Sequence, residues 1–282
     1  MKNFGRVGTT ASWVFVVPAG FSYLLPDATR AVDGVAPVVM QGDGVAIAVI
    51  ERNGRTIATV KRGIQQSSPN GSVARSGGLL VNGDFSYGLN GWSWSQSGGS
   101  SSPGQVVAES GHAAISEGDS FLVTLQQSFF LPGYGATLSF DLVLTPGFDQ
   151  TDNFIPDAFE ASLLDSNGNP IVPTWDPLAT SFFNMQEDGA VLVGAGVTWN
   201  GTTATVDLSA VGPHTGVTLY FDFIGADSDT AGGVRIDNVR ADCAGDCIPA
   251  VSTWGLIVMA LAVLSAGTLI LTRRRPTRAI PL

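Results

Sequence analysis

Residues 121–130, FLVTLQQSFF, and residues 136–144, ATLSFDLVL, decide the fold class of this chain. Both are apolar, β-prone runs of strand length, and the residues between them contain the proline and glycines of a turn. Similar short runs, bounded by Gly, Pro, Asn or Asp, occupy residues 159–164, 191–193, 203–208 and 217–224. This spacing is typical of a β-sandwich.

We therefore assign residues 79–242 to one all-β, jelly-roll-like antiparallel sandwich, long enough at about 165 residues to bury a core. Composition agrees, because charged residues make up 13% and the chain holds 35 Gly and 15 Pro. Residues 79–247 carry 20 acidic and 2 basic side chains. Such a surface repels nucleic acid, which we exclude as a partner.

Short motifs stand at the two ends of this domain. It opens with residues 82–86, NGDFS, and Trp92, and it closes with residues 236–239, IDNV. Together they resemble galactose-binding-like jelly rolls, including several carbohydrate-binding-module families. The resemblance implies that the first and last strands are neighbours, that Phe85 and Trp92 pack in the core, and that Asp237 supports a calcium ion. It also makes polysaccharide the candidate ligand.

Acidic side chains supply two candidate calcium sites, because calcium takes carboxylate and carbonyl oxygens as ligands. The resemblance places one site at Asp84 and Asp237. Asp149, Asp152 and Asp157 form a second group at short spacing, without the twelve-residue pattern of an EF-hand. The alternative for both groups is a solvated acidic surface, with structural calcium as the one cofactor we consider.

Three tryptophans in turn-like contexts, Trp94, Trp175 and Trp199, are candidate platforms for stacking on sugar rings, although burial in the sandwich is the alternative. The sequence contains no Gly-x-Ser-x-Gly elbow, no His-Glu-x-x-His zinc motif and no phosphate-binding glycine loop. With 20 acidic residues in residues 79–247, no glycosidase pair stands out. We expect no enzymatic activity.

The N-terminal region differs from the sandwich. Residues 1–31 begin with basic residues and an apolar run, which is the order of a secretory signal. The alternative is that the first residue of the sequence is displaced from the natural start. Residues 32–66 predict a short β-hairpin, because two β-rich runs, 45–51 and 56–61, flank an Asn-Gly turn. A lone hairpin is marginally stable, so a small module and disorder both stay open. Residues 67–78 have the composition of a linker.

The C-terminal segment, residues 248–275, predicts a transmembrane helix. Its nineteen residues from 254 to 272 span roughly 28 Å as a helix, and the arginines after them predict a cytoplasmic end at residues 276–282. Ile-Pro, Trp-Gly, an apolar span and three arginines follow one another in order. That order resembles the IPTL-type C-terminal sorting tail, which implies an exosortase-like protease as partner. The matching residues are Ile248, Pro249, Trp254, Gly255, Arg273, Arg274 and Arg275. The alternative is a plain single-pass anchor.

Residues 243–247 form a neck that contains both cysteines of the chain, Cys243 and Cys247. In an oxidising exterior they are candidates for a local disulfide. A zinc site and a free or lipid-modified thiol are the alternatives.

The sequence therefore predicts an exported cell-surface or extracellular-matrix protein. It is membrane-anchored with its N-side outside, or released or surface-attached after the tail is processed. Its sandwich is non-catalytic, with carbohydrate binding as the candidate role. The alternatives are a purely structural adhesion or matrix component without a ligand site, and the accessory domain of a hydrolase.

Overall fold

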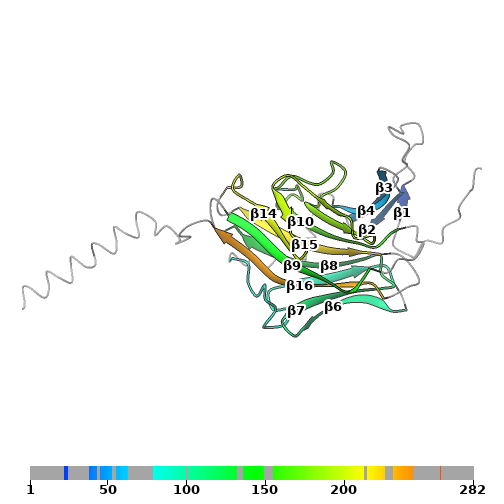
Figure 1. The fold of residues 1–282 in the computed structure, drawn as a ribbon, viewed down its shortest axis with the longest axis horizontal. Coiled ribbons are helices and arrows are strands. Elements are labelled where there is room, and N and C mark those ends of the chain that lie inside the picture. The colour runs from blue at the N-terminus through cyan, green and yellow to red at the C-terminus, as the bar shows by residue number, and fades with distance from the viewer. Residues whose placement is uncertain are drawn as a thin grey trace, which may run out of the picture.

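The described residues form three antiparallel β-sheets, which we name A, B and C (Figure 1). The computed structural model describes residues 22–24, 38–42, 45–52, 55–62, 79–99, 101–131, 136–148, 155–212, 215–225, 231–243 and 261. Sheet A holds four strands in the order β1 (Ser22–Leu24), β2 (Val38–Gly42), β3 (Val45–Arg52) and β4 (Arg55–Arg62).

Sheets B and C hold six strands each and form the two layers of a sandwich. Sheet B has the order β12 (Val191–Val193), β11 (Phe183–Gln186), β10 (Ala158–Leu164), β15 (Gly216–Ile224), β8 (Leu122–Phe130) and β5 (Ser93–Ser97). Sheet C has the order β13 (Val197–Trp199), β14 (Thr203–Asp207), β9 (Ala136–Gly147), β16 (Gly233–Cys243), β7 (His112–Gly118) and β6 (Pro103–Glu109).

The predicted antiparallel sandwich is thus confirmed. The two runs that decided the fold class, 121–130 and 136–144, are β8 and most of β9. They lie in opposite sheets of the sandwich, β8 in sheet B and β9 in sheet C.

Aromatic side chains fill the space between sheets B and C. Phe140 of β9 lies 5.0 Å from the ring of Phe221 and 6.3 Å from that of Phe159, measured between ring centroids. Phe85 and Trp92 are buried, as the resemblance implied, and their rings are 5.3 Å apart. The core is therefore an aromatic layer held by non-directional burial.

The opening motif is held together by Asn82 and bound to the last strand. The Asn82 side chain donates to the carbonyls of Gly88 and Asn90 and accepts from the amide of Tyr87. Gly83 accepts the amide of Val239 in β16 at 2.9 Å, which makes the first segment a neighbour of the last strand. A methyl group at Gly83 would lie 1.9 Å from the Val239 carbonyl oxygen, so this approach requires glycine.

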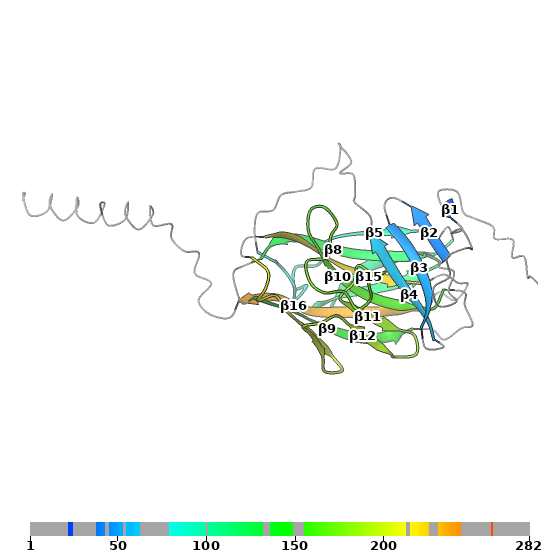
Figure 2. The ribbon, with the colours of Figure 1, turned by 90° about the horizontal axis from the view of Figure 1, so that it is seen from above.

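Sheet A lies against the outer face of sheet B, over β10 and β15 (Figures 1 and 2). The predicted hairpin is β3 and β4, which pair antiparallel from Val45–Arg62 to Arg52–Arg55. Strand β1 comes from the segment with signal-like composition and pairs with β2. The hairpin is therefore part of a four-stranded sheet whose edge strand, β4, contacts the sandwich.

Candidate functional site: the outer face of sheet B

The strands of sheet B alternate apolar residues toward the core with polar residues toward the outer face. In β10, Phe159 faces the core and Glu160 faces outward, and in β15 Phe221 and Asp222 do the same. We call the outward polar side chains the polar face. Its members are Ser93, Ser95, Thr124, Gln126, Ser128, Glu160, Ser162, Asn184, Gln186, Thr218, Tyr220 and Asp222.

Cross-strand pairing arranges the polar face in rows. One row runs across five strands, from Asn184 through Glu160, Asp222 and Thr124 to Ser95. The polar face also divides by exposure. The buried half consists of Thr124, Glu160, Ser162, Asn184, Gln186 and Asp222. The open half, partly or fully exposed, consists of Ser93, Ser95, Gln126, Ser128, Thr218 and Tyr220.

Glu160 is the centre of the buried half. Its Oε1 accepts hydrogen bonds from Thr59, Ser181 and Asn184, each at 2.7 Å, and its Oε2 accepts the Val60 amide at 2.7 Å. Complete burial raises the pKa of Glu160 to about 7, because loss of hydration outweighs the hydrogen bonds that favour the carboxylate. Glu160 therefore titrates near neutral pH while it holds β4.

Backbone groups of β4 find their partners in sheet B and in Thr180, which lies just before β11. The Ala58 amide donates to Gln186 Oε1 at 3.1 Å, and the Ala58 carbonyl accepts from Asn184 and Gln186. The Val60 carbonyl accepts from both the hydroxyl and the amide of Thr180. Because β4 is the edge strand of sheet A, these bonds satisfy groups that an uncovered edge would leave unpaired.

Arg62 of β4 contacts the cross-strand row of the polar face at Asp222. Their side chains form an ion pair that is 4% and 0% exposed, and Thr124 also donates to Asp222 at 2.6 Å. The guanidinium carbon lies 4.1 Å from the centre of the Tyr220 ring, within the range of a cation–π contact. Beside this pair, Ile47, Val49, Ala58 and Val60 pack on sheet B in a small apolar cluster with Leu122, Ile155, Ala158 and Ile224.

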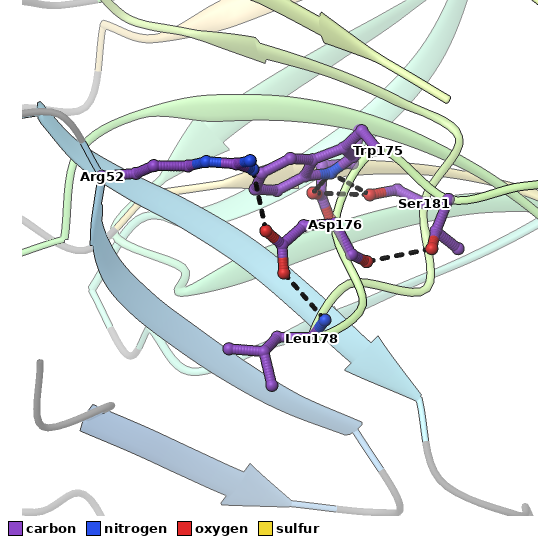
Figure 3. A network of polar contacts seen from close by, with 7 residues as sticks. Arg52, Trp175, Asp176, Leu178 and Ser181 are labelled. Carbon is purple, nitrogen blue, oxygen red and sulfur yellow. Dashed lines mark hydrogen bonds and ion pairs between the residues drawn. The ribbon is translucent and has the colours of Figure 1, made fainter. Parts of the chain in front are cut away.

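A loop of the sandwich closes the contact from the side (Figure 3). Arg52 at the end of β3 forms an ion pair with Asp176 at 2.9 Å, and Asp176 also accepts the amide of Leu178. The neighbouring Trp175 donates its indole N–H to Ser181 Oγ at 2.9 Å. With Arg52 half exposed, this outer pair contributes little compared with the buried pair of Arg62.

The three candidate stacking tryptophans have different surroundings. Trp94 is 43% exposed on the edge strand β5. Trp175 is half-buried in the loop just described, with its indole N–H bonded to Ser181. Trp199 is half-buried and meets Phe183 edge-on at 5.2 Å. Among the three, Trp94 offers the most open ring.

The candidate calcium ligands that the structure describes, Asp84, Asp157 and Asp237, have different surroundings. Asp84 is exposed and accepts from Ser86, which lowers its pKa, and Asp237 accepts the amide of Asn238. Asp149 and Asp152 lie outside the described residues. Asp157 is fully buried. Among the described residues, no group of three His, Cys, Asp or Glu side chains is placed to hold a metal ion.

Asp157 does have a carboxylate neighbour that sequence reasoning missed. A methyl group at Gly232 would lie 2.3 Å from Glu117 Oε2 and 2.8 Å from Asp157 Oδ2, so both carboxylates converge on this glycine. Glu117 is 1% exposed. Glu160, Asp222 and Arg62 were missed as well, although a charged residue within an apolar strand is the signal that marks two of them.

The tail and the neck stay predictions. Ile248, Pro249, Trp254, Gly255, the three arginines and Cys247 lie outside the described residues, whereas Cys243 ends β16. Within the part of the chain that is described, no helix is long and apolar enough to cross a membrane.

No protein-family model matches the sequence, and no curated protein matches it. Among solved structures, a CBM4 module is similar, at 20% identity and a TM-score of 0.32, over 57% of this chain and 97% of that one. The K3 cleaved adhesin domain of Lys-gingipain from Porphyromonas gingivalis W83 has 17% identity and a TM-score of 0.35, over 59% and 99%. CBM28, a module specific for non-crystalline cellulose, has 18% identity and a TM-score of 0.32, over 60% and 97%. With TM-scores below 0.5, none of these similarities indicates a ligand.

Proposed function

We propose that the protein is an exported, non-catalytic surface or extracellular-matrix protein that binds polysaccharide through the open half of the polar face. The observation that carries this proposal is the set of exposed hydroxyl and amide groups that the open half presents on the three adjacent strands β15, β8 and β5. Ser93, Gln126 and Thr218 supply donors and acceptors for sugar hydroxyls, whereas Trp94, which pairs with the core residue Leu125, points to the other face of β5.

Binding of the full chain to an array of neutral and acidic glycans tests this proposal. We expect Gln126→Ala to weaken binding about tenfold or more, in line with the loss of a hydrogen-bond contact, and Trp94→Ala, on the opposite face of β5, to leave binding unchanged. Thr205→Ala, on β14 of sheet C, is the matched control and should leave binding unchanged. Silence across the array, with and without calcium, would leave the purely structural adhesion or matrix component as the function.

Export and processing form a separate part of the proposal. We propose that the C-terminal segment is a sorting tail and that an exosortase-like protease acts near Ile248 and Pro249. Replacing both residues with alanine should leave unprocessed, membrane-held protein, visible as a larger mass by mass spectrometry. An unchanged mature mass would favour the plain anchor.

Calcium is proposed at Glu117 and Asp157, because two buried carboxylates that converge on Gly232 form a suitable part of a hard-cation site. Chelation should lower the melting temperature of the protein, and Glu117→Gln should remove that sensitivity. A melting curve indifferent to chelator would count against the ion.

A further inference from the structure

The buried half of the polar face holds β4 by hydrogen bonds to its backbone and by the Arg62–Asp222 ion pair. We propose that it is a binding site for an extended β-strand, occupied by β4 of the same chain, and that sheet A is a releasable occupant of this site. The proposal does not depend on polysaccharide binding, because β4 contacts the buried half and the Tyr220 ring, whereas polysaccharide is proposed to bind at Ser93, Gln126 and Thr218.

The first argument is that the site forms hydrogen bonds with the backbone of β4. Both polar backbone groups of Ala58 and of Val60 are bonded to sandwich residues, through Gln186, Asn184, Glu160 and Thr180. Since the residues are two apart, their groups point to the same side only in an extended chain. These bonds therefore require an extended backbone, and they do so whatever side chains the strand carries.

The second argument is that side chains of β4 supply sequence selectivity, beginning with the buried Thr59 hydroxyl that donates to Glu160. Arg62 continues the same alternation and forms its buried pair with Asp222 beneath the ring of Tyr220. Ala58 is fully buried, so a larger residue there would clash with sheet B. The site thus fits a strand with a small residue, then a β-branched residue, then arginine at alternate positions, which is the Ala58–Val60–Arg62 pattern.

The third argument is that sheet A and the sandwich core are separate. Among the side chains that the structure describes, the main core cluster draws every buried member from residues 85–239, and none from β3 or β4. The buried apolar residues of β3 and β4, Ile47, Val49, Ala58 and Val60, belong to the small cluster at the contact. Residues 63–78, which join the two parts, have a reach of up to about 50 Å when extended, so release does not require the sandwich to move.

A fourth observation distinguishes this contact from a core. Among the described residues, Arg62 Nε, Asp222 Oδ2 and Ser162 Oγ are buried without a hydrogen-bond partner. Polar atoms left without a partner make docking less favourable, because each has lost its hydration without gaining a hydrogen bond in return. A partly satisfied polar contact is what reversible docking requires.

The test uses two preparations of the full chain with a protease site inserted between residues 70 and 71. One carries a donor fluorophore on its N-terminal piece, and the other an acceptor on its sandwich. After cleavage under native conditions, we expect each N-terminal piece to stay bound during size exclusion. On mixing, energy transfer should develop as the pieces exchange, while near-ultraviolet circular dichroism shows the sandwich still folded.

Competition with an unlabelled, cleaved variant then tests the recognition itself. A cleaved Arg62→Ala protein should compete at least about thirtyfold more weakly than wild type, because a buried charge loses its partner. Cleaved Lys61→Ala, altered at the exposed neighbour in the same strand, should compete within about twofold of wild type. Dissociation of the pieces at micromolar concentration, exchange only after the sandwich unfolds, or equal competition by Arg62→Ala would each overturn the proposal.

Discussion

The two faces of sheet B are built from neighbouring residues and yet make opposite kinds of contact. Phe159 and Phe221 face sheet C and pack among rings, whereas Glu160 and Asp222, one residue further along each strand, face sheet A through hydrogen bonds and an ion pair. The inner face beneath sheet C and the part of the outer face beneath sheet A are both buried. The difference therefore lies in the chemistry of the contact and not in its burial.

This difference separates the part that makes the fold from the part that is added to it. Aromatic burial is non-directional and proportional to area, so the inner face stabilises the whole sandwich. The outer contact is directional and charged, so it confers specificity at a smaller net gain in free energy. We expect changes on the inner face to act on the entire molecule, and changes on the outer face to act on sheet A alone.

The largest effect should follow from a cavity in the inner contact. Phe140→Ala removes a ring that touches Phe159, Phe182, Phe183 and Phe221. We expect the free energy of unfolding, measured by urea denaturation, to fall by about 3–5 kcal/mol. Val143→Ala, at an exposed position of the same strand, is the control and should cost far less. Similar losses for the two variants would show that the inner face is not the main source of stability.

A smaller and local effect should follow from Asp222→Asn on the outer face. The change keeps the shape of the side chain but leaves the Arg62 charge without its buried partner. We expect hydrogen-exchange protection of the Ala58 and Val60 amides to fall about a hundredfold, equivalent to about 3 kcal/mol, as sheet A undocks.

Sandwich amides should keep their protection in Asp222→Asn, and Glu109→Gln, at an exposed end of β6, should change neither set. A uniform loss of protection across both parts would mean that sheet A is an integral layer of the fold. That result would remove the distinction between the two faces.

The pH dependence of docking sharpens the comparison further. The folded-state pKa of Glu160 is raised to about 7 from an ordinary value of 4.5, chiefly because burial removes its hydration. The folded protein then binds more protons than the unfolded chain between these values, so stability is full below about pH 4.5 and decreases as pH rises through about 7. The decrease is at most about 3 kcal/mol.

Hydrogen-exchange protection of the Ala58 and Val60 amides from about pH 5 to pH 8, corrected for the pH dependence of intrinsic exchange, measures this slope, and Glu160→Gln should abolish it. The glutamine amide would face the Val60 amide as a second donor, so the variant should also be less stable at every pH. Stability that rises with pH across this window in wild type, and not in Glu160→Gln, would contradict the assignment.

The sequence predicted the inner face well and the outer face poorly. Apolar alternation marked the strands at 121–130, 136–144 and 217–224, because the inner face needs only regular burial. The resemblance also implied the burial of Phe85 and Trp92. Strands β6 and β7 were missed, since their residues, PGQVVAE and HAAISEG, include glycine, proline and acidic groups that are depleted in strands.

The outer contact was out of reach of sequence reasoning for a physical reason. Ala58 and Val60 are held through backbone groups that every residue possesses, and their partners lie 100 or more residues away. No local pattern reports such a pairing. The hairpin itself was predicted from its Asn-Gly turn, whereas its docking depends on where the fold places Glu160 and Gln186.

The smallest effect should come from the open half of the polar face. Thr218 and Ser128 share a hydrogen bond of 2.8 Å between hydroxyls on adjacent strands, and both side chains keep contact with water. Thr218→Val removes one hydroxyl with little change of shape, and water can satisfy the Ser128 hydroxyl that remains. We expect a loss of less than about 1 kcal/mol in urea denaturation and no change in the protection of β4 amides. Because Thr218 and Asp222 lie on the same face of the same strand, a large loss here would show that the open half is also structural, and the division of the polar face into two halves would no longer hold.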